Sequence, residues 1–70
     1  MLSARNQFKG TVISVRSGSV MSEVVIRIAP GLEIVSLISA SSAKRLKLKK
    51  GKAATAVVKA TEVIVSTGEE

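Results

Sequence analysis

The segment Val20–Ala29 constrains the fold more than any other part of this sequence. Valine and isoleucine recur at every second position in its second half, a period that is typical of a β-strand with one buried face. The preceding segment Thr11–Arg16 is rich in β-branched residues and ends at the turn-forming residues Ser17–Ser19. Pro30–Gly31 predicts a tight turn before a third strand over Leu32–Ser39. The first half of the chain is therefore expected to form three strands.

The second half of the chain predicts a short helix and then two more strands. Ser39–Ser42 offers hydroxyl groups for a helix N-cap, and Ala43–Lys47 continues with helical spacing towards a glycine that ends the segment. Lys52–Lys59 and Glu62–Val65 favour strands joined tightly around Ala60–Thr61. An all-β fold with one short helix between strands three and four is expected to be a five-stranded, OB-like Greek-key barrel. A β-sandwich is the alternative.

The length of the chain indicates one domain that needs additional stabilisation. No linker or internal repeat divides residues 1–70, which are expected to fold as one unit. A domain of this size buries only about 60% of the surface that its unfolded chain exposes. The chain has no cysteine for a disulfide and no histidine for a zinc site, while 46% of its residues are hydrophobic. We therefore expect a homo-oligomer, with a very hydrophobic monomeric barrel as the alternative.

The charge of the chain indicates an anionic ligand or partner. Eleven Lys and Arg residues stand against five Asp and Glu residues, which gives a net charge of +6. The candidate partners are nucleic acids, anionic membranes and small oxyanions. No apolar run approaches the about 20 residues that span a bilayer, and Met1–Asn6 lacks the hydrophobic core of a signal peptide. The expected location is the cytoplasm, without a membrane partner.

Motifs for catalysis are nearly absent from the sequence. The chain has no histidine, no cysteine nucleophile, no paired carboxylates and no glycine-rich phosphate loop. Glu23, Glu33 and Glu62 are scattered among the strands, where carboxylates lie in solvent or pair with cations. A catalytic Lys59 would have no partner to activate it. We expect a binding protein and not an enzyme, without a site for a bare metal ion.

Single-stranded nucleic acid is the alternative ligand, because OB-like barrels bind it in a basic groove. Such grooves stack bases on exposed aromatic side chains, whereas this chain has Phe8 as its one aromatic residue. Phe8 is expected in the core or an interface, so that charge alone would support weak, salt-sensitive binding of phosphates. The basic run Lys44–Lys52 is interpreted as a solvated helix face with a turn. Its other interpretation is a positive field that attracts anions.

The polar segment near the N-terminus contains the donors that a tetrahedral oxyanion requires. Ser3, Arg5 and Asn6 supply a hydroxyl, a guanidinium and a carboxamide, in addition to backbone N–H groups. An arginine fork holds two oxygens of such an anion, and backbone N–H groups can bind the others. Lys59, which follows an apolar strand, would add a positive charge. On residue types alone, a polar terminus without a ligand is the simpler interpretation.

The sequence resembles a known family over essentially its whole length. The segments that carry the resemblance, in order and spacing, are Ser3–Gly10, Val24–Ile26, Ile38–Ala43, Leu48–Gly51 and Val57–Ile64. They are similar to the molbindins, the small Mop proteins with a TOBE/Mop domain. The resemblance implies a homo-oligomer, expected as a hexamer built as a trimer of dimers, that binds molybdate or tungstate between subunits. It also implies a role in intracellular molybdenum storage and homeostasis.

The same resemblance implies which residues bind the oxyanion. They are Ser3, Ala4, Arg5, Asn6, Lys59, Ala60 and Thr61. Ala60 offers only its backbone N–H group, whereas Thr61 adds a hydroxyl. A second class of site, placed more loosely, is implied around Val20–Ser22 and Ser39. Molybdate and tungstate have nearly the same size, shape and charge, so no residue type in the chain separates them.

Overall fold

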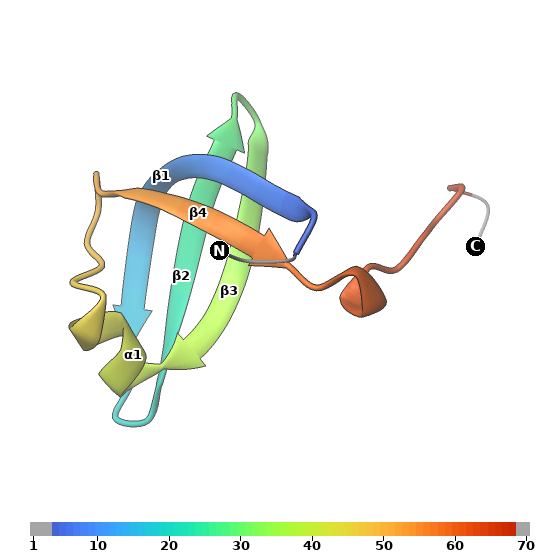
Figure 1. Cartoon of the computed structure of the whole chain (residues 1–70). Coiled ribbons are helices and arrows are strands. Elements are labelled where there is room, and N and C mark those ends of the chain that lie inside the picture. The colour runs from blue at the N-terminus through green and yellow to red at the C-terminus, as the bar shows by residue number, and fades with distance from the viewer. Residues whose placement is uncertain (1–3, 69–70) are drawn as a thin grey trace.

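The computed structural model describes residues 4–68 and shows a strongly curled antiparallel sheet with one short helix (Figure 1). The elements in chain order are β1 (Asn6–Ser17), β2 (Met21–Ala29), β3 (Leu32–Ser39), α1 (Ala40–Arg45), β4 (Ala53–Val58) and the 3₁₀ helix η1 (Ala60–Glu62). The strand order in the sheet is β3-β2-β1-β4. This is the spatial order of a Greek key, in which the fourth strand returns beside the first. The predicted all-β class and the helix between the third and fourth strands are confirmed.

β1 gives the sheet its curl because two different strands pair with its two halves. Residues 6–11 pair with β4, and residues 11–17 pair with β2. A bulge between Val12 and Ser14 interrupts the second ladder, and bulges increase the local twist of a strand. Gly10 lies at the bend, where an added Cβ would meet the backbone carbonyl of Arg27 and would lie 2.9 Å from Cγ2 of Ile26. The close approach of β1 to β2 at this bend therefore leaves no room for a side chain at position 10.

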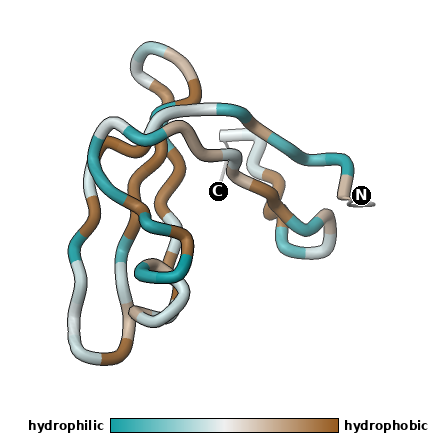
Figure 2. The backbone as a smooth tube through the Cα atoms, turned by 60° about the vertical axis from the view of Figure 1, so that its left-hand side comes forward, coloured by the Kyte–Doolittle hydropathy of each residue, from teal (hydrophilic) through white to brown (hydrophobic). Residues whose placement is uncertain are grey.

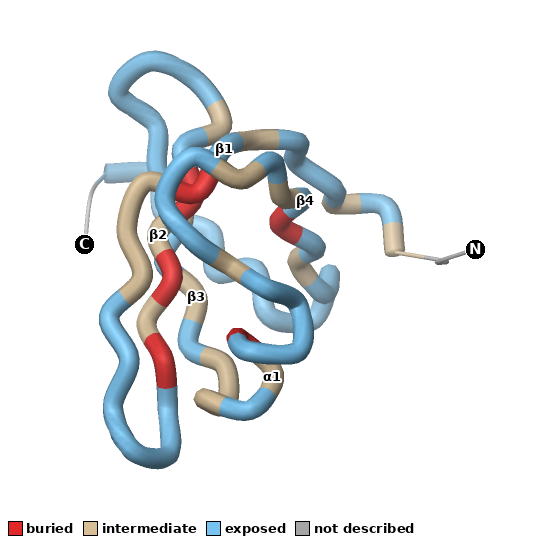
Figure 3. Tube along the Cα trace, turned by 90° about the vertical axis from the view of Figure 1, so that its left-hand side faces the viewer, coloured by how far each residue is buried: buried red, intermediate tan, exposed pale blue. Residues whose placement is uncertain are grey.

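The core lies inside the curl of the sheet. Val12, Val24, Ile26 and Ala56 form its buried centre, and they come from β1, β2 and β4 (Figure 3). Six further apolar side chains pack against them, namely Val15, Ile28, Ile34, Ile38, Leu48 and Ala54. The hydropathy of the chain follows this arrangement, since the hydrophobic residues concentrate along the strands (Figure 2). The predicted alternation in Val20–Ala29 is confirmed, because Val24 and Ile26 are buried and Arg27 is exposed.

The helix α1 forms where the serine cluster predicts it. Ser39 is the N-cap, and its Oγ accepts a hydrogen bond from the backbone N–H of Ser42 at 3.1 Å. Ala43 is the buried residue of the helix. After the helix, Lys47 adopts a left-handed backbone conformation with φ 55°, and the N–H of Leu48 donates to the carbonyl of Ala43 at 3.1 Å. This turn ends the helix and directs Leu48 towards the core.

Ser39→Ala is expected to lower the free energy of unfolding by about 1 kcal/mol, because the helix loses its N-cap. Ser41→Ala is the matched control, since Ser41 is exposed and its Oγ lies 3.3 Å from that of Ser39 without capping the backbone. Urea unfolding followed by far-ultraviolet circular dichroism, at one protein concentration, measures both variants. An equal loss for the two variants would contradict the capping role.

The fifth strand predicted over Glu62–Val65 is wrong for the single chain. Ala60–Glu62 forms η1, and residues 63–67 have no regular secondary structure. The β-branched residues there favour a strand, but a strand requires a neighbouring backbone with which to pair. After η1 the chain leads away from the sheet (Figure 1). The described residues therefore form a four-stranded sheet whose two edges are β3 and β4.

The first strand also differs from the prediction, because it begins earlier. β1 starts at Asn6 and not at Thr11, and its additional residues pair with β4 from Asn6 opposite Val58 onwards. The alternation of apolar and polar residues is weak in this part of the chain, because Phe8 is the one large apolar residue between Gln7 and Lys9. Pairing with β4, which is far away in sequence, holds this half of the strand.

Candidate functional site

The predicted oxyanion-binding residues belong to two segments, one before β1 and one after β4. Both segments lie at the same end of the β1–β4 strand pair. In the ladder between β1 and β4, Asn6 is opposite Val58. Because the strands are antiparallel, the residues before Asn6 and those after Val58 leave the ladder together. Arg5 therefore lies beside the start of β1, and Lys59 follows directly on the end of β4. Ser3 lies outside the described residues.

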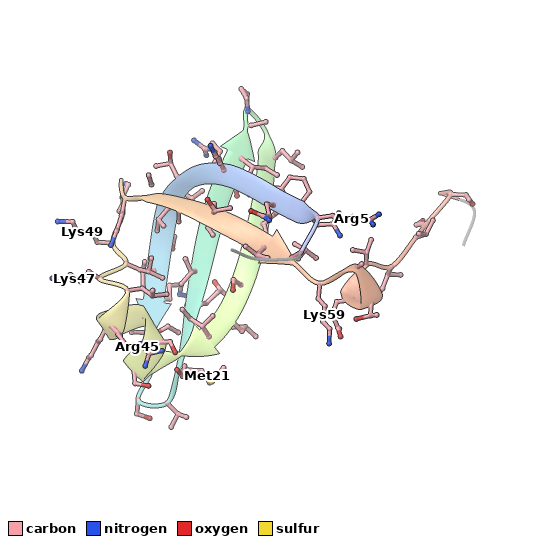
Figure 4. All side chains as sticks on the ribbon, viewed as in Figure 1. Arg5, Met21, Arg45, Lys47, Lys49 and Lys59 are labelled. Carbon is pink, nitrogen blue, oxygen red and sulfur yellow. The ribbon has the colours of Figure 1, made fainter. Side chains whose placement is uncertain are left out.

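The cations of Arg5 and Lys59 are exposed and point in different directions. Arg5 extends outward just before the start of β1, and Lys59 extends from the chain between β4 and η1 (Figure 4). Within residues 4–68 the one ion pair joins Arg27 to Glu33 at 3.0 Å. No acidic side chain of that part of the chain therefore neutralises Arg5 or Lys59. This end of the sheet carries positive charge that is open to solvent in a single chain.

The remaining predicted site residues have smaller side chains and lie around the same end of the β1–β4 strand pair. Ala4 and Asn6 are partly buried, whereas Ala60 and Thr61 are exposed in η1. The N–H of Glu62 donates to the carbonyl of Lys59 at 2.9 Å, which closes the turn of η1. The described site residues thus lie around one end of the β1–β4 strand pair, but their side chains do not converge on a single point.

Gln7 is a residue that the sequence reasoning did not assign to the site. Its Nε2 donates a hydrogen bond to the backbone carbonyl of Ala4 at 2.6 Å. This bond links β1 to the residue before Arg5. Its position within the Ser3–Gly10 motif was the available signal, but the pairing with Ala4 depends on backbone geometry.

The second class of site, expected around Val20–Ser22 and Ser39, does not present free hydroxyl donors in the single chain. Met21 pairs with Ser39 across β2 and β3, at the end of the sheet beside α1 (Figure 4). Ser22 is buried, and its Oγ donates to Oγ of Ser17 at 3.0 Å. The Ser39 hydroxyl caps α1 and bonds to the hydroxyl of Ser42 at 2.7 Å. The structure brings Met21 and Ser39 together, and the hydroxyls nearby bond within the chain.

The basic run forms a separate surface at the far side of the molecule. Lys44, Lys47 and Lys49 are exposed on α1 and the turns that follow it, and the labelled Lys47 and Lys49 point away from the sheet (Figure 4). Arg45 makes one contact there, a hydrogen bond from its Nη2 to Oγ of Ser42 at 3.3 Å. The arrangement is that of a solvated helix face, as predicted.

Among residues 4–68, no group of three or more His, Cys, Asp or Glu side chains could hold a metal ion. None of the helices found in that region has the length and apolar character needed to cross a bilayer. A groove with a volume of about 700 Å³ lies between β3 and β4 and has mainly apolar side chains, with Lys59 and Glu62 as its charged residues.

Comparison with known proteins identifies the family. The TOBE domain family matches residues 2–65. The chain is 48% identical over 64 residues to molybdenum-pterin-binding protein 2 of Clostridium pasteurianum, an alignment that covers 91% of this chain and 94% of the relative. The chain is therefore a TOBE-domain protein. It belongs, within that class, to the molbindin or Mop family.

Solved structures agree with this assignment. A molybdate-binding protein from Sporomusa ovata superposes with a TM-score of 0.87 at 38% identity, over 94% of this chain and 97% of that one. The cytoplasmic molybdate-binding protein ModG, solved with molybdate bound, gives a TM-score of 0.86 at 42% identity. That alignment covers 91% of this chain and 45% of ModG. The curled antiparallel sheet with one short helix is thus the fold of known molybdate-binding proteins.

Proposed function

We propose that the protein binds molybdate, and also tungstate, as an intact oxyanion at the boundary between copies of the chain. The observation that carries the proposal is the register of β1 and β4, which brings Arg5 and Lys59 to one strand end with no acidic partner among the described residues. The Sporomusa protein and ModG, both described as molybdate-binding, support the same ligand. In such a site molybdenum or tungsten is bound as part of an intact oxyanion, so no side chain needs to coordinate the metal directly.

The chemistry of the proposed site follows from its donors. The Arg5 guanidinium offers two parallel N–H groups to two oxygens, and the Lys59 ammonium adds a compact positive charge. Ser3 and Thr61 contribute hydroxyl groups, Asn6 a carboxamide, and Ala4 and Ala60 backbone N–H groups. These groups donate hydrogen bonds without reacting, so the proposed role is binding and not catalysis.

A second copy of the chain is required to complete the site. Arg5 and Lys59 point in different directions in one chain (Figure 4), so this arrangement does not enclose a tetrahedral anion and a second copy would supply the other side. When a neighbouring copy covers this end, its Lys59 approaches Arg5 from the opposite side and excludes water. Charge-assisted hydrogen bonds are stronger in such a site than in bulk water. We expect a hexamer built as a trimer of dimers, in the cytoplasm, in the storage and homeostasis of molybdenum.

Exposed apolar side chains support an oligomer independently of the ligand. Val35 and Leu37 on β3 are 60% and 68% exposed, and Val20 is 71% exposed. Contact with further copies would remove this surface from water, at about 25 cal/mol per Å² of apolar area.

Calorimetry with molybdate, repeated with a single-stranded oligonucleotide, tests the function. Molybdate is expected to give saturable heat that persists at moderate salt, because the proposed site excludes water. The oligonucleotide is expected to bind weakly and to lose affinity steeply as salt rises, since its contacts would be phosphates alone. Phe8 offers one aromatic ring, which is 40% exposed and cannot form a row of stacking platforms. Tight, salt-resistant oligonucleotide binding without molybdate heat would reverse the assignment.

A further inference from the structure

The cations of α1 and of the turns after it form a surface without a neutralising carboxylate. Residues 34–61 contain no Asp or Glu. Within residues 4–68 the one ion pair joins Arg27 to Glu33, on β2 and β3. Like charges at close range repel one another, so a partner with closely spaced negative charges is favoured at this surface. We refer to the five exposed cations of residues 44–50 as the basic patch, namely Lys44, Arg45, Lys47, Lys49 and Lys50.

The backbone that carries the basic patch is held by hydrogen bonds to β1. The N–H of Gly51 donates to the carbonyl of Val12 at 2.8 Å, and the N–H of Val12 donates to the carbonyl of Lys52 at 2.9 Å. The ammonium of Lys52 donates to the carbonyl of Leu46, so this lysine stabilises the turn and is not part of the patch. A partner would therefore bind to a preformed turn and would need to order side chains but not the backbone.

The apolar residues of the same stretch do not belong to the basic patch. Leu48 packs against the core, Ala43 is buried, and Leu46 lines the groove between β3 and β4. Residues 40–52 include no aromatic residue, no Asn and no Gln. Lys47 and Lys49 point away from the sheet (Figure 4). The patch thus presents positive charge without a hydrophobic anchor and without amide groups to recognise a base.

The composition of the basic patch favours one class of polyanion over the others. Protein interfaces obtain most of their binding energy from aromatic and apolar anchors and are depleted in lysine, which supplies four of these five cations. Surfaces that bind membranes combine cations with apolar side chains that enter the lipid. The phosphates of a nucleic acid require only cations, because the counterions released on binding provide the driving force.

We propose that the basic patch binds the phosphate backbone of double-stranded DNA without regard to base sequence. A duplex carries about one negative charge per 1.7 Å of its axis, a density that suits five cations within seven residues. A single strand offers fewer charges and is bound mainly by stacking on aromatic rings, which the patch lacks. The patch lies on the far side of the molecule from Arg5 (Figure 4), so the proposal does not depend on the oxyanion function.

The salt dependence of binding tests the proposal with the full chain. The probe is a fluorescent DNA duplex of about 12 base pairs, about 40 Å in length, chosen to match the 38 Å long axis of one copy. Five phosphate contacts predict a slope of about −4.5 for the logarithm of the association constant against the logarithm of the salt concentration. Between about 50 and about 200 mM salt, the affinity measured by anisotropy should fall several hundredfold. An absence of binding at the lower salt concentration, or an affinity independent of salt, would overturn the proposal.

A pair of double variants shows whether the basic patch or the net charge binds the duplex. Lys47→Gln with Lys49→Gln removes two cations of the patch, which should reduce the slope by about 2 and the affinity at low salt at least tenfold. Lys9→Gln with Arg16→Gln is the matched control, since it removes two exposed cations of β1. Circular dichroism and sedimentation check that both variants retain the fold and the oligomer. Equal losses of affinity in the two double variants would contradict a local site.

Competing partners and molybdate complete the test. Polyglutamate and phosphatidylglycerol vesicles, at the same concentration of negative charge, should bind at least tenfold more weakly than the duplex. Equal or tighter binding of either would overturn the proposal, in favour of an acidic protein or a membrane. Saturating molybdate at constant ionic strength should leave duplex binding unchanged, whereas displacement of the duplex would place it at the oxyanion site. Duplex binding without molybdate heat contradicts only the proposed function, and molybdate heat without duplex binding contradicts only the DNA contact.

Discussion

Arg5→Ala is expected to weaken molybdate binding by roughly tenfold to a few hundredfold. Hydrogen bonds to a charged group contribute about 1.5–3 kcal/mol, and about 1.4 kcal/mol corresponds to a factor of ten in affinity. Arg5 is exposed before β1 begins, so the substitution removes the proposed ligand contact without disturbing the core. Isothermal titration calorimetry measures the affinity, and sedimentation checks that the oligomer is retained.

Two further variants define the role of Arg5. Arg5→Lys is expected to recover only part of the lost affinity, because an ammonium lacks the planar fork of a guanidinium. Lys49→Ala is the matched control, since it removes one exposed cation from the basic run on the far side of the molecule (Figure 4). It should change the association rate at low salt more than the affinity. If Lys49→Ala abolished binding while Arg5→Ala bound normally, the site would lie at the basic run.

Gly10→Ala is expected to lower the free energy of unfolding by about 3 kcal/mol, the upper end of the range for overpacking. The added methyl group would clash with the backbone carbonyl of Arg27 and lie 2.9 Å from Cγ2 of Ile26. A backbone carbonyl within a strand ladder cannot turn aside as a flexible side chain can. Since small domains have only several kcal/mol of net stability, this loss is severe. Urea unfolding at fixed protein concentration measures it.

Gly18→Ala is the control for the glycine substitution. A Cβ at Gly18 would lie 3.3 Å from the carbonyl oxygen of Met21, with no other close neighbour, in the exposed turn between β1 and β2. The expected cost is below about 1 kcal/mol, because a surface turn can adjust by small displacements. Comparable losses for the two glycines would show that steric contact at Gly10 does not determine the curl.

Local patterns were sufficient to predict most of the fold. The alternation around Val24 and Ile26 predicted which face of β2 is buried, and the serines before Ala43 predicted the start of α1. Both signals arise from interactions within a few residues. The strand predicted over Glu62–Val65 failed for a different reason. Residue preference specifies that a segment can be extended, but its pairing partner is determined by tertiary geometry or by another chain.

The candidate site was less accessible from the sequence. Arg5 and Lys59 were selected through a resemblance to a family, because their residue types alone are those of any basic surface. The structure adds the reason for their proximity, which is the pairing of Asn6 with Val58. It also adds the bond from Gln7 to the carbonyl of Ala4, which no spacing rule predicts. The divergence of the two cations depends on side-chain directions at a strand end, and these are absent from a linear pattern.

The division of β1 between two partners has a consequence for local unfolding. Before Thr11, β1 pairs with β4 alone, and the ladder ends at Asn6 and Val58. Terminal pairs of a ladder open more often than central ones, and the two cations beside this end repel each other. A bound dianion would attract both cations, offset their repulsion and hold the start of β1 and the end of β4 together. Ligand binding would then suppress fraying at the margin of the sheet, and amide exchange at Phe8, which lies opposite Ala56, would slow well before exchange at the buried Val24 changed.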